Sequence, residues 1–155
     1  MTSRRDFLQT GGCFALALAA ALGLSAGLEG LPIRLTEGSG DGELRTYPIP
    51  PADGVHVDWK AQVMLARYQG TVYAFSLACP HQQAVVQWLP NDHRFQCTKH
   101  HSRYTPTGVY MSGRATRNLD RYALQRNGAQ LVVNLDHWFR SDQEPAAWAA
   151  AAVKL

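Results

Sequence analysis

The chain has 155 residues and a formal net charge of +3, with 46% hydrophobic and 17% charged residues. This length allows one domain with an appendage, and the composition is that of a globular protein, which excludes a disordered or fibrous chain. The small basic excess argues against a nucleic-acid-binding face, and three cysteines are too few for a disulfide-dense scaffold.

The N-terminus carries adjacent arginines, Arg4 and Arg5, before an uncharged apolar run from Cys13 to Leu28. This pattern resembles a twin-arginine export signal, which carries folded proteins across the cytoplasmic membrane. We expect residues 1–28 to form either a removed signal or a retained anchor, with an apolar helix over 7–28 and retention preferred. The remainder of the chain is then expected on the periplasmic side.

Residues 29–43 predict a linker, because the stretch from Thr36 to Gly42 is rich in flexible residues and has no apolar period. Charge changes sign along the chain. Residues 29–58 hold two arginines and six acids, a net charge of −4, whereas residues 94–126 hold seven basic residues and one acid, a net charge of +6. Such a dipolar domain can steer a charged partner, although a solvated basic face would look the same in sequence.

Short β-branched and aromatic runs dominate the next hundred residues. The runs at 62–68 and 71–76 flank a glycine-containing turn, residues 94–96 predict a short strand, and the runs at 122–125 and 130–135 flank Asn127-Gly128. These are hairpin signals, and no long amphipathic helix lies between them. We therefore predict an all-β domain over residues 44–140, an antiparallel sandwich or small barrel.

The last segment, residues 141–155, predicts a short alanine-rich helix. Ser141 is a candidate N-cap with Glu144 three residues later, and Pro145 follows in the first turn. Trp148 is expected to pin this helix to the sandwich, and a partner-binding tail is the alternative.

Four residues carry the chemistry. Cys79 and His81 follow one predicted strand in a Cys-x-His pattern, and Cys97 and His100 follow another in a Cys-x-x-His pattern. Two thiolates and two imidazoles on neighbouring loops suit zinc or an iron–sulfur cluster. A zinc module would be colourless, whereas a 2Fe–2S cluster is coloured and gives an EPR signal when reduced.

The spacing of these four residues resembles the signature of the Rieske family, and the resemblance covers residues 44–136. It implies a Rieske-type fold with cluster-binding loops and one 2Fe–2S cluster, in which Cys79 and Cys97 hold one iron and His81 and His100 hold the other. Two ferric ions, two sulfides and two thiolates have no net charge, so adding an electron costs less than it does at a four-thiolate cluster. Rieske potentials accordingly lie at about −150 to +300 mV.

Two hydroxyl residues follow the second histidine. Ser102 and Tyr104 occupy the offsets at which high-potential Rieske proteins place hydrogen-bond donors to the cluster and its ligands. The resemblance therefore implies that both residues contact the cofactor and raise its potential into the positive half of the range.

Departures from the family pattern bear on the partner. Many quinol-oxidising members join the cluster loops by a disulfide, but those two positions are Ala84 and Lys99 here. His101 stands where a glycine often follows the second ligand, and we interpret it as an exposed residue or a neighbour of the ligands. Both departures weaken the case for direct quinol docking.

Together these features predict an exported one-electron carrier, the Rieske subunit of a membrane-associated respiratory oxidoreductase. Its donor would be quinol or an enzyme, its partners cytochromes of b or c type, and it would have no substrate pocket of its own. The alternative is the small subunit of a molybdenum enzyme of the arsenite oxidase kind. A Rieske oxygenase component is a weaker alternative, because it needs a further iron held by two histidines and a carboxylate.

Overall fold

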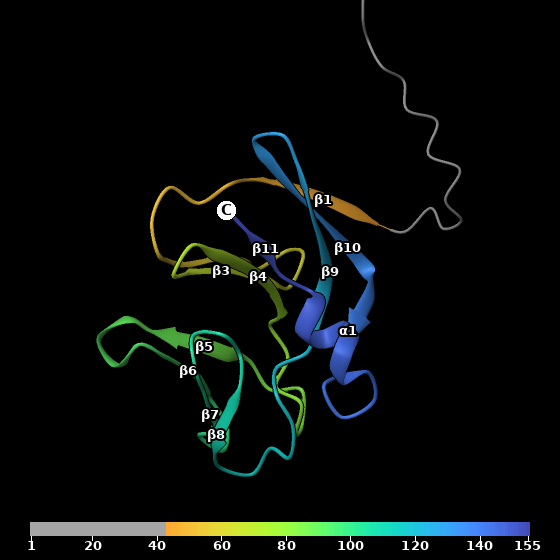
Figure 1. The fold of residues 1–155 in the computed structure, drawn as a ribbon. Coiled ribbons are helices and arrows are strands. Elements are labelled where there is room, and N and C mark those ends of the chain that lie inside the picture. Colours follow the sequence, from red (N-terminus) through yellow and green to blue (C-terminus); the bar gives the residue numbers. More distant parts are fainter. Residues whose placement is uncertain (1–42) are drawn as a thin grey trace, which may run out of the picture. The chain divides into compact units, whose positions relative to one another are not determined.

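The computed structural model describes residues 43–155. The predicted signal or anchor (1–28) and nearly all of the predicted linker (29–43) lie outside these residues. Among residues 43–155, no helix is long and apolar enough to cross a membrane. The prediction of a mostly antiparallel β fold with one short C-terminal helix is confirmed (Figure 1).

The larger sheet has seven strands in the order β1-β10-β9-β4-β3-β2, and β11 adds to β4. All of its pairings are antiparallel. The strands are β1 (Leu44–Pro48), β2 (Gly54–Asp58), β3 (Val63–Tyr68), β4 (Thr71–Ser76), β9 (Arg121–Asn127), β10 (Gln130–Phe139) and β11 (Val153–Lys154).

Both predicted hairpins are present, and one turn differs from its prediction by a residue. In the β3–β4 turn, Gln69 and Gly70 both take positive φ values of 49° and 72°, as a tight two-residue hairpin turn requires. In the β9–β10 hairpin, Asn127 pairs with Gln130, so the turn consists of Gly128 and Ala129 instead of Asn127 and Gly128. Gly128 supplies the positive φ, at 59°.

The smaller sheet is an insertion between β4 and β9. It has four strands in the order β5-β6-β7-β8, and a single 3-10 turn, η1 (Pro90–Asp92), joins the first two. The strands are β5 (Val86–Leu89), β6 (Arg94–Cys97), β7 (Arg103–Tyr104) and β8 (Tyr110–Ser112). We call residues 77–120 the inserted lobe.

The two ends of the inserted lobe are fastened to each other. Phe75 of β4 pairs with Arg121 of β9, and the Ser76 amide donates to the Asp120 carbonyl at 3.0 Å. The chain therefore leaves and re-enters the larger sheet at adjacent points. One apolar cluster, which includes Phe75, Phe95 and Leu119, contains residues of both the sheet and the lobe and fixes the lobe on its base.

The C-terminal segment differs in detail from its prediction. Helix α1 covers Pro145–Ala150 with Glu144 as N-cap, so Ser141 does not cap it. Instead, Ser141 Oγ accepts a hydrogen bond from the Asn118 amide at 3.2 Å. The chain then adds β11 to the edge of β4, which the alanine-rich sequence did not indicate.

Trp148 of α1 contacts the β domain, as expected, at the base of the inserted lobe. Its indole N–H donates to the Leu119 carbonyl at 2.7 Å, and the Arg121 guanidinium lies 3.7 Å from its ring centroid. Arg121 is only 4% exposed and donates to the carbonyls of Trp148 and Thr107, both at 2.8 Å. A buried cation thus fastens the helix to the root of the lobe through carbonyl dipoles and aromatic faces, with no carboxylate partner in the described part of the chain.

This arrangement predicts that Trp148→Phe lowers the free energy of unfolding by about 1–3 kcal/mol, because the buried Leu119 carbonyl loses its donor. Urea denaturation measures the change. Trp59→Phe is the matched control, since Trp59 is 65% exposed. Equal losses in the two variants would contradict the prediction.

Candidate metal centre

The two loops that carry the Cys and His residues have the same backbone form. In the first loop the Cys79 amide donates to the Ala84 carbonyl at 2.8 Å, and the Gln83 amide donates back to the Cys79 carbonyl at 2.8 Å. In the second loop, Cys97 bonds in the same way to Ser102 at 2.9 Å and to His101 at 3.2 Å. Each cysteine therefore opens a tight loop that closes five residues later.

Each loop has a residue in the left-handed conformation four residues after its cysteine. These residues are Gln83, with φ 53°, and His101, with φ 55°. A left-handed backbone favours glycine, which accounts for the glycine that often follows the second histidine in the family pattern. His101 is exposed, and its Nδ1 lies 3.3 Å from the Gln96 side-chain amide. The interpretation of His101 as an exposed neighbour agrees with this placement.

The ladder between β5 and β6 sets the two loops side by side. Val86, at the start of β5, pairs with Cys97 at the end of β6. One step further, the Val85 carbonyl accepts two hydrogen bonds from Thr98, one from its amide and one from its hydroxyl, both at 3.0 Å. This Thr98–Val85 link joins the loops in a chain that has Ala84 and Lys99 at the positions of the family disulfide.

The four predicted ligand residues come together at this junction. Cys79 and Cys97 are 1% and 2% exposed, both are free thiols, and the two side chains lie close enough to interact. The rings of His81 and His100 meet edge to face with centroids 5.0 Å apart. The sulfurs are buried in the core, whereas both imidazoles are half-buried at the surface.

The donor atoms of both histidines are left without protein partners. Nδ1 of His81 and Nδ1 of His100 are shielded from solvent, and neither has a hydrogen-bond partner among the described residues. A buried ring nitrogen without a partner costs free energy unless something else binds it. A neutral imidazole nitrogen can donate its lone pair to a metal ion, and two nearby thiols can supply further ligands.

The sulfurs lie in unlike surroundings. Burial raises the pKa of the Cys79 thiol, and the Tyr104 hydroxyl, 3.3 Å from its Sγ, partly offsets this. Burial acts the same way on Cys97, but the backbone amides of His100 and Lys99 outweigh it and hold the pKa of that thiol below its usual value. Amides that point at a sulfur favour the thiolate, the form in which cysteine binds metals.

The imidazole of His100 is kept neutral by its surroundings. The pKa of His100 is lowered by partial burial and then by the positive charges around it, of which Arg114 is the largest. A lowered pKa favours the uncharged imidazole, and only that form can donate a lone pair to a metal. These surroundings thus favour the metal-binding form of His100, as the backbone amides do for Cys97.

Ser102 and Tyr104 both lie beside the donors. Ser102 is fully buried, and its Oγ accepts from the amides of Arg114 and Ala115, each at 3.1 Å. Because both of those bonds use its oxygen, the hydroxyl proton remains available to a further acceptor. Tyr104 is also fully buried, and burial followed by the neighbouring Cys79 raises the pKa of its phenol.

Gly113 explains how a third segment closes over Ser102. A Cβ at this position, whose φ is 114°, would lie 2.5 Å from Ser102 Cα and 2.8 Å from Ser102 Oγ. Only glycine permits this approach, which brings the following amides of Arg114 and Ala115 onto the Ser102 oxygen. Nothing in the sequence besides the glycine itself indicates this contact.

The donor geometry suits two metal ions better than one. Among residues 43–155, no three His, Cys, Asp or Glu side chains gather around a single point. In a Rieske-type 2Fe–2S cluster each iron needs only two ligands from the protein, because the sulfides of the cluster supply the others. Two thiols on one side and two imidazoles on the other match that demand.

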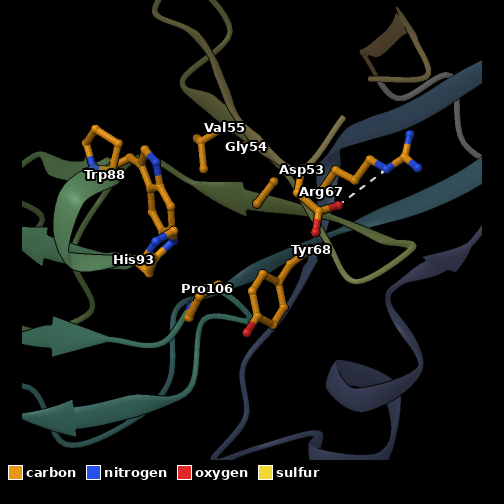
Figure 2. Close-up of a pocket in the computed structure, with 10 residues that line it drawn as sticks. Asp53, Gly54, Val55, Arg67, Tyr68, Trp88, His93 and Pro106 are labelled. Carbon is orange, nitrogen blue, oxygen red and sulfur yellow. Dashed lines mark ion pairs between the residues drawn. The ribbon is translucent and has the colours of Figure 1, made fainter. Parts of the chain in front are cut away.

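A separate pocket lies away from these donors. Figure 2 shows Trp88, His93 and Pro106 of the inserted lobe opposite Val55 and Tyr68 of the larger sheet. None of the candidate ligands lines this pocket. Its lining is largely apolar, and the one ion pair that it holds, between Arg67 and Asp53, is already complete at 3.5 Å.

Comparison with known proteins agrees with the donor set. Residues 47–123 match the model of the Rieske [2Fe-2S] domain. This chain contains a Rieske domain. The domain implies a 2Fe–2S cluster, and all four candidate donors fall within the matched residues.

The similar proteins are distant. The cytochrome b6-f complex iron-sulfur subunit of Chlorobaculum thiosulfatiphilum is 26% identical over 73 residues, which are 47% of this chain and 40% of the relative. The plasma membrane Rieske protein PetC3 from Synechocystis PCC 6803 is 27% identical, with 52% of this chain and 83% of that chain covered and a TM-score of 0.44. The ferredoxin of carbazole 1,9a-dioxygenase from Nocardioides aromaticivorans IC177 is 24% identical, with 46% and 73% covered and a TM-score of 0.37.

The Thr98–Val85 link gives a prediction for this Rieske domain. Thr98→Val removes the hydroxyl bond to the Val85 carbonyl but keeps the backbone bond. Losing about 0.5–1.5 kcal/mol from the junction of the loops should speed cluster loss by roughly two- to tenfold. Bleaching of the visible spectrum in excess iron chelator measures the rate.

The matched control is Thr116→Val. Thr116 is exposed and has no side-chain hydrogen bond among the described residues. An unchanged bleaching rate in Thr98→Val, or the same increase in both variants, would show that the hydroxyl does not hold the loops together.

Proposed function

We propose that this protein is an exported one-electron carrier, the Rieske subunit of a membrane-associated respiratory oxidoreductase. It accepts electrons from quinol or from a donor enzyme and passes them to a cytochrome c-type acceptor. The observation that carries the proposal is the pairing of two buried thiols with two surface imidazoles whose Nδ1 atoms have no hydrogen-bond partner within residues 43–155.

In this proposal, Cys79 and Cys97 hold one iron through sulfur, and His81 and His100 hold the other through Nδ1. A 2Fe–2S cluster bound in this way takes up and releases one electron. The cysteines anchor the buried side, where Tyr104 donates to Cys79 and backbone amides face Cys97. The half-buried histidines form the edge that a partner can reach.

Three findings support a respiratory partner. The paired arginines and apolar run of residues 1–28 resemble an export signal. The curated relative belongs by name to a cytochrome b6-f complex, and the similar solved protein is described as a plasma membrane Rieske protein. Export and membrane association are thus inferred from these resemblances. Cell fractionation of the full chain tests both.

The ligand assignment is tested by His81→Ala and His100→Ala in the full chain. We expect each variant to lose the Rieske EPR signal of the reduced protein, together with most of its iron and acid-labile sulfide. His56→Ala and His137→Ala are controls, because both of these side chains are exposed and lie outside the loops. A cluster that survives loss of both His81 and His100 would refute the assignment.

The hydroxyl groups around the cysteines predict a midpoint potential above 0 mV, since hydrogen bonds to sulfur stabilise the more negative reduced state. Tyr104→Phe removes the donor to Cys79. A differential bond energy of about 1 kcal/mol corresponds to a fall of roughly 40 mV. An EPR-monitored redox titration measures both values.

Tyr110→Phe is the matched control for this measurement. The Tyr110 ring lies 6.1 Å from that of Tyr104, but its hydroxyl donates to the Gly113 carbonyl at 2.8 Å and not to a sulfur. Its removal should leave the potential nearly unchanged. A wild-type midpoint below 0 mV, or equal shifts in both variants, would count against the role given to Tyr104.

A further inference from the structure

Positive charge lies near the histidine edge, by which we mean the half-buried rings of His81 and His100. Three segments lie around it: the first loop (79–85), the second loop with β7 (97–104), and the segment that covers Ser102 (113–116). Together they contain Lys99, Arg103 and Arg114 and no acidic residue. All three cations are exposed, and within residues 43–155 none of them has an ion-pair partner.

The other basic residues between 94 and 126 are engaged elsewhere. Arg94 pairs with Asp92 at 2.9 Å, and Arg117 pairs with Asp120 at 2.9 Å. Arg121 is buried under α1. Arg126 donates to the Gly128 carbonyl in the β9–β10 turn at 3.0 Å. Among residues 94–126, the exposed cations without an ion pair are therefore Lys99, Arg103 and Arg114 in the segments around the histidines, and Arg126 in the β9–β10 turn.

These three residues belong to backbone segments next to the rings. Lys99 directly precedes His100 in the second loop, and the Arg114 amide donates to the Oγ of Ser102, two residues after His100, at 3.1 Å. Arg103 pairs across the small sheet with Gln96, whose side chain contacts His101. On the first loop, Val85 is 39% exposed. The edge therefore has an apolar residue and two half-buried rings at its centre and charged residues around them. An apolar centre with a polar rim is common in interfaces between proteins.

We propose that this rim, defined as Lys99, Arg103 and Arg114, docks an electron-transfer protein that carries an acidic face around its own redox group. The inference rests on the proposed function and adds the charge of the partner. A positive rim raises the local concentration of an acidic partner and orients it, so that its redox group meets the imidazole edge. The partner and the histidines then lie within the same contact.

An acidic protein fits this rim better than an anionic membrane surface does. Sequence-readable lipid binding uses clusters of four to eight basic residues, and the rim has only three. The rim also surrounds the only edge at which the four donors approach solvent, since both cysteines are buried. A lipid headgroup at that place would cover the route by which electrons pass.

The test uses one redox protein in two charge states. Native horse-heart cytochrome c is basic, and succinylation of its lysines makes the same haem protein acidic. Stopped-flow spectroscopy follows oxidation of the reduced, full-length Rieske protein by each form. We expect the succinylated form to react about tenfold faster at low salt, with a rate that falls as ionic strength rises, because salt screens attraction. The rate with the native form should rise with ionic strength.

Charge-neutral variants locate the effect. Lys99→Gln, Arg103→Gln and Arg114→Gln should each lower the low-salt rate with the succinylated form by about two- to fivefold and flatten its salt dependence. Arg94→Gln and Arg126→Gln remove the same unit of charge at sites outside the rim, and they should leave the salt slope within experimental error. EPR spectra of all five variants confirm that the cluster is intact.

The possible results separate the two proposals. Equal rates and equal salt slopes for the two cytochrome forms, or rim and control variants that behave alike, would overturn the docking rim while leaving electron transfer itself in place. Sedimentation with phosphatidylglycerol vesicles that depends on the rim, while the salt slope with succinylated cytochrome does not, would also overturn it in favour of a lipid surface. No oxidation of the reduced protein by either cytochrome would contradict the proposed function instead.

Discussion

The pairing of Val86 with Cys97 is the constraint on which the site depends. It fixes the register between β5 and β6, and the register decides which residues of the two loops face each other. A slip of one residue would turn Cys97 away from the core and carry His100 with it, because side chains alternate across a strand. The Thr98–Val85 link continues the same ladder past the strand end and prevents the loops from separating.

From this register comes the division between buried sulfur and surface nitrogen. Cys79 and Cys97 belong to the apolar cluster that also contains Phe75 and Phe95, so the residues that pack the lobe also hold the sulfurs. The histidines stand further along their loops, at the surface. A bound cluster therefore has one rigid, desolvated side and one side open to a partner. The exposed cations lie around the open side, where they affect association and not packing.

Much of this could be predicted from the sequence, because the decisive signals are local. The Cys-x-His and Cys-x-x-His spacings and the hairpin around Gln69-Gly70 involve residues close together in the chain. Predictions were less accurate where distant contacts decide the outcome. Ser141 looks like a helix cap in the sequence, but its hydroxyl oxygen accepts a hydrogen bond from the Asn118 amide instead.

The sequence was also silent on contacts that have no short-range pattern. Thr98 reads as an ordinary loop residue until the carbonyl of Val85 is placed beside it. The seven basic residues between 94 and 126 look equivalent in sequence. Only the fold separates the two that are ion-paired, the one that is buried and the one in the β9–β10 turn from the three of the rim. In each case the missing information is the position of a partner far along the chain.

The way in which the inserted lobe is mounted has a consequence for how such domains diversify. Its two ends lie next to each other, joined by the Ser76–Asp120 hydrogen bond of 3.0 Å and clamped beneath α1 by Arg121. Insertions with adjacent ends disturb their hosts least. The loops of the lobe can therefore lose a crosslink or change their surface charge during evolution. The larger sheet that carries the lobe keeps its register and stability when they do.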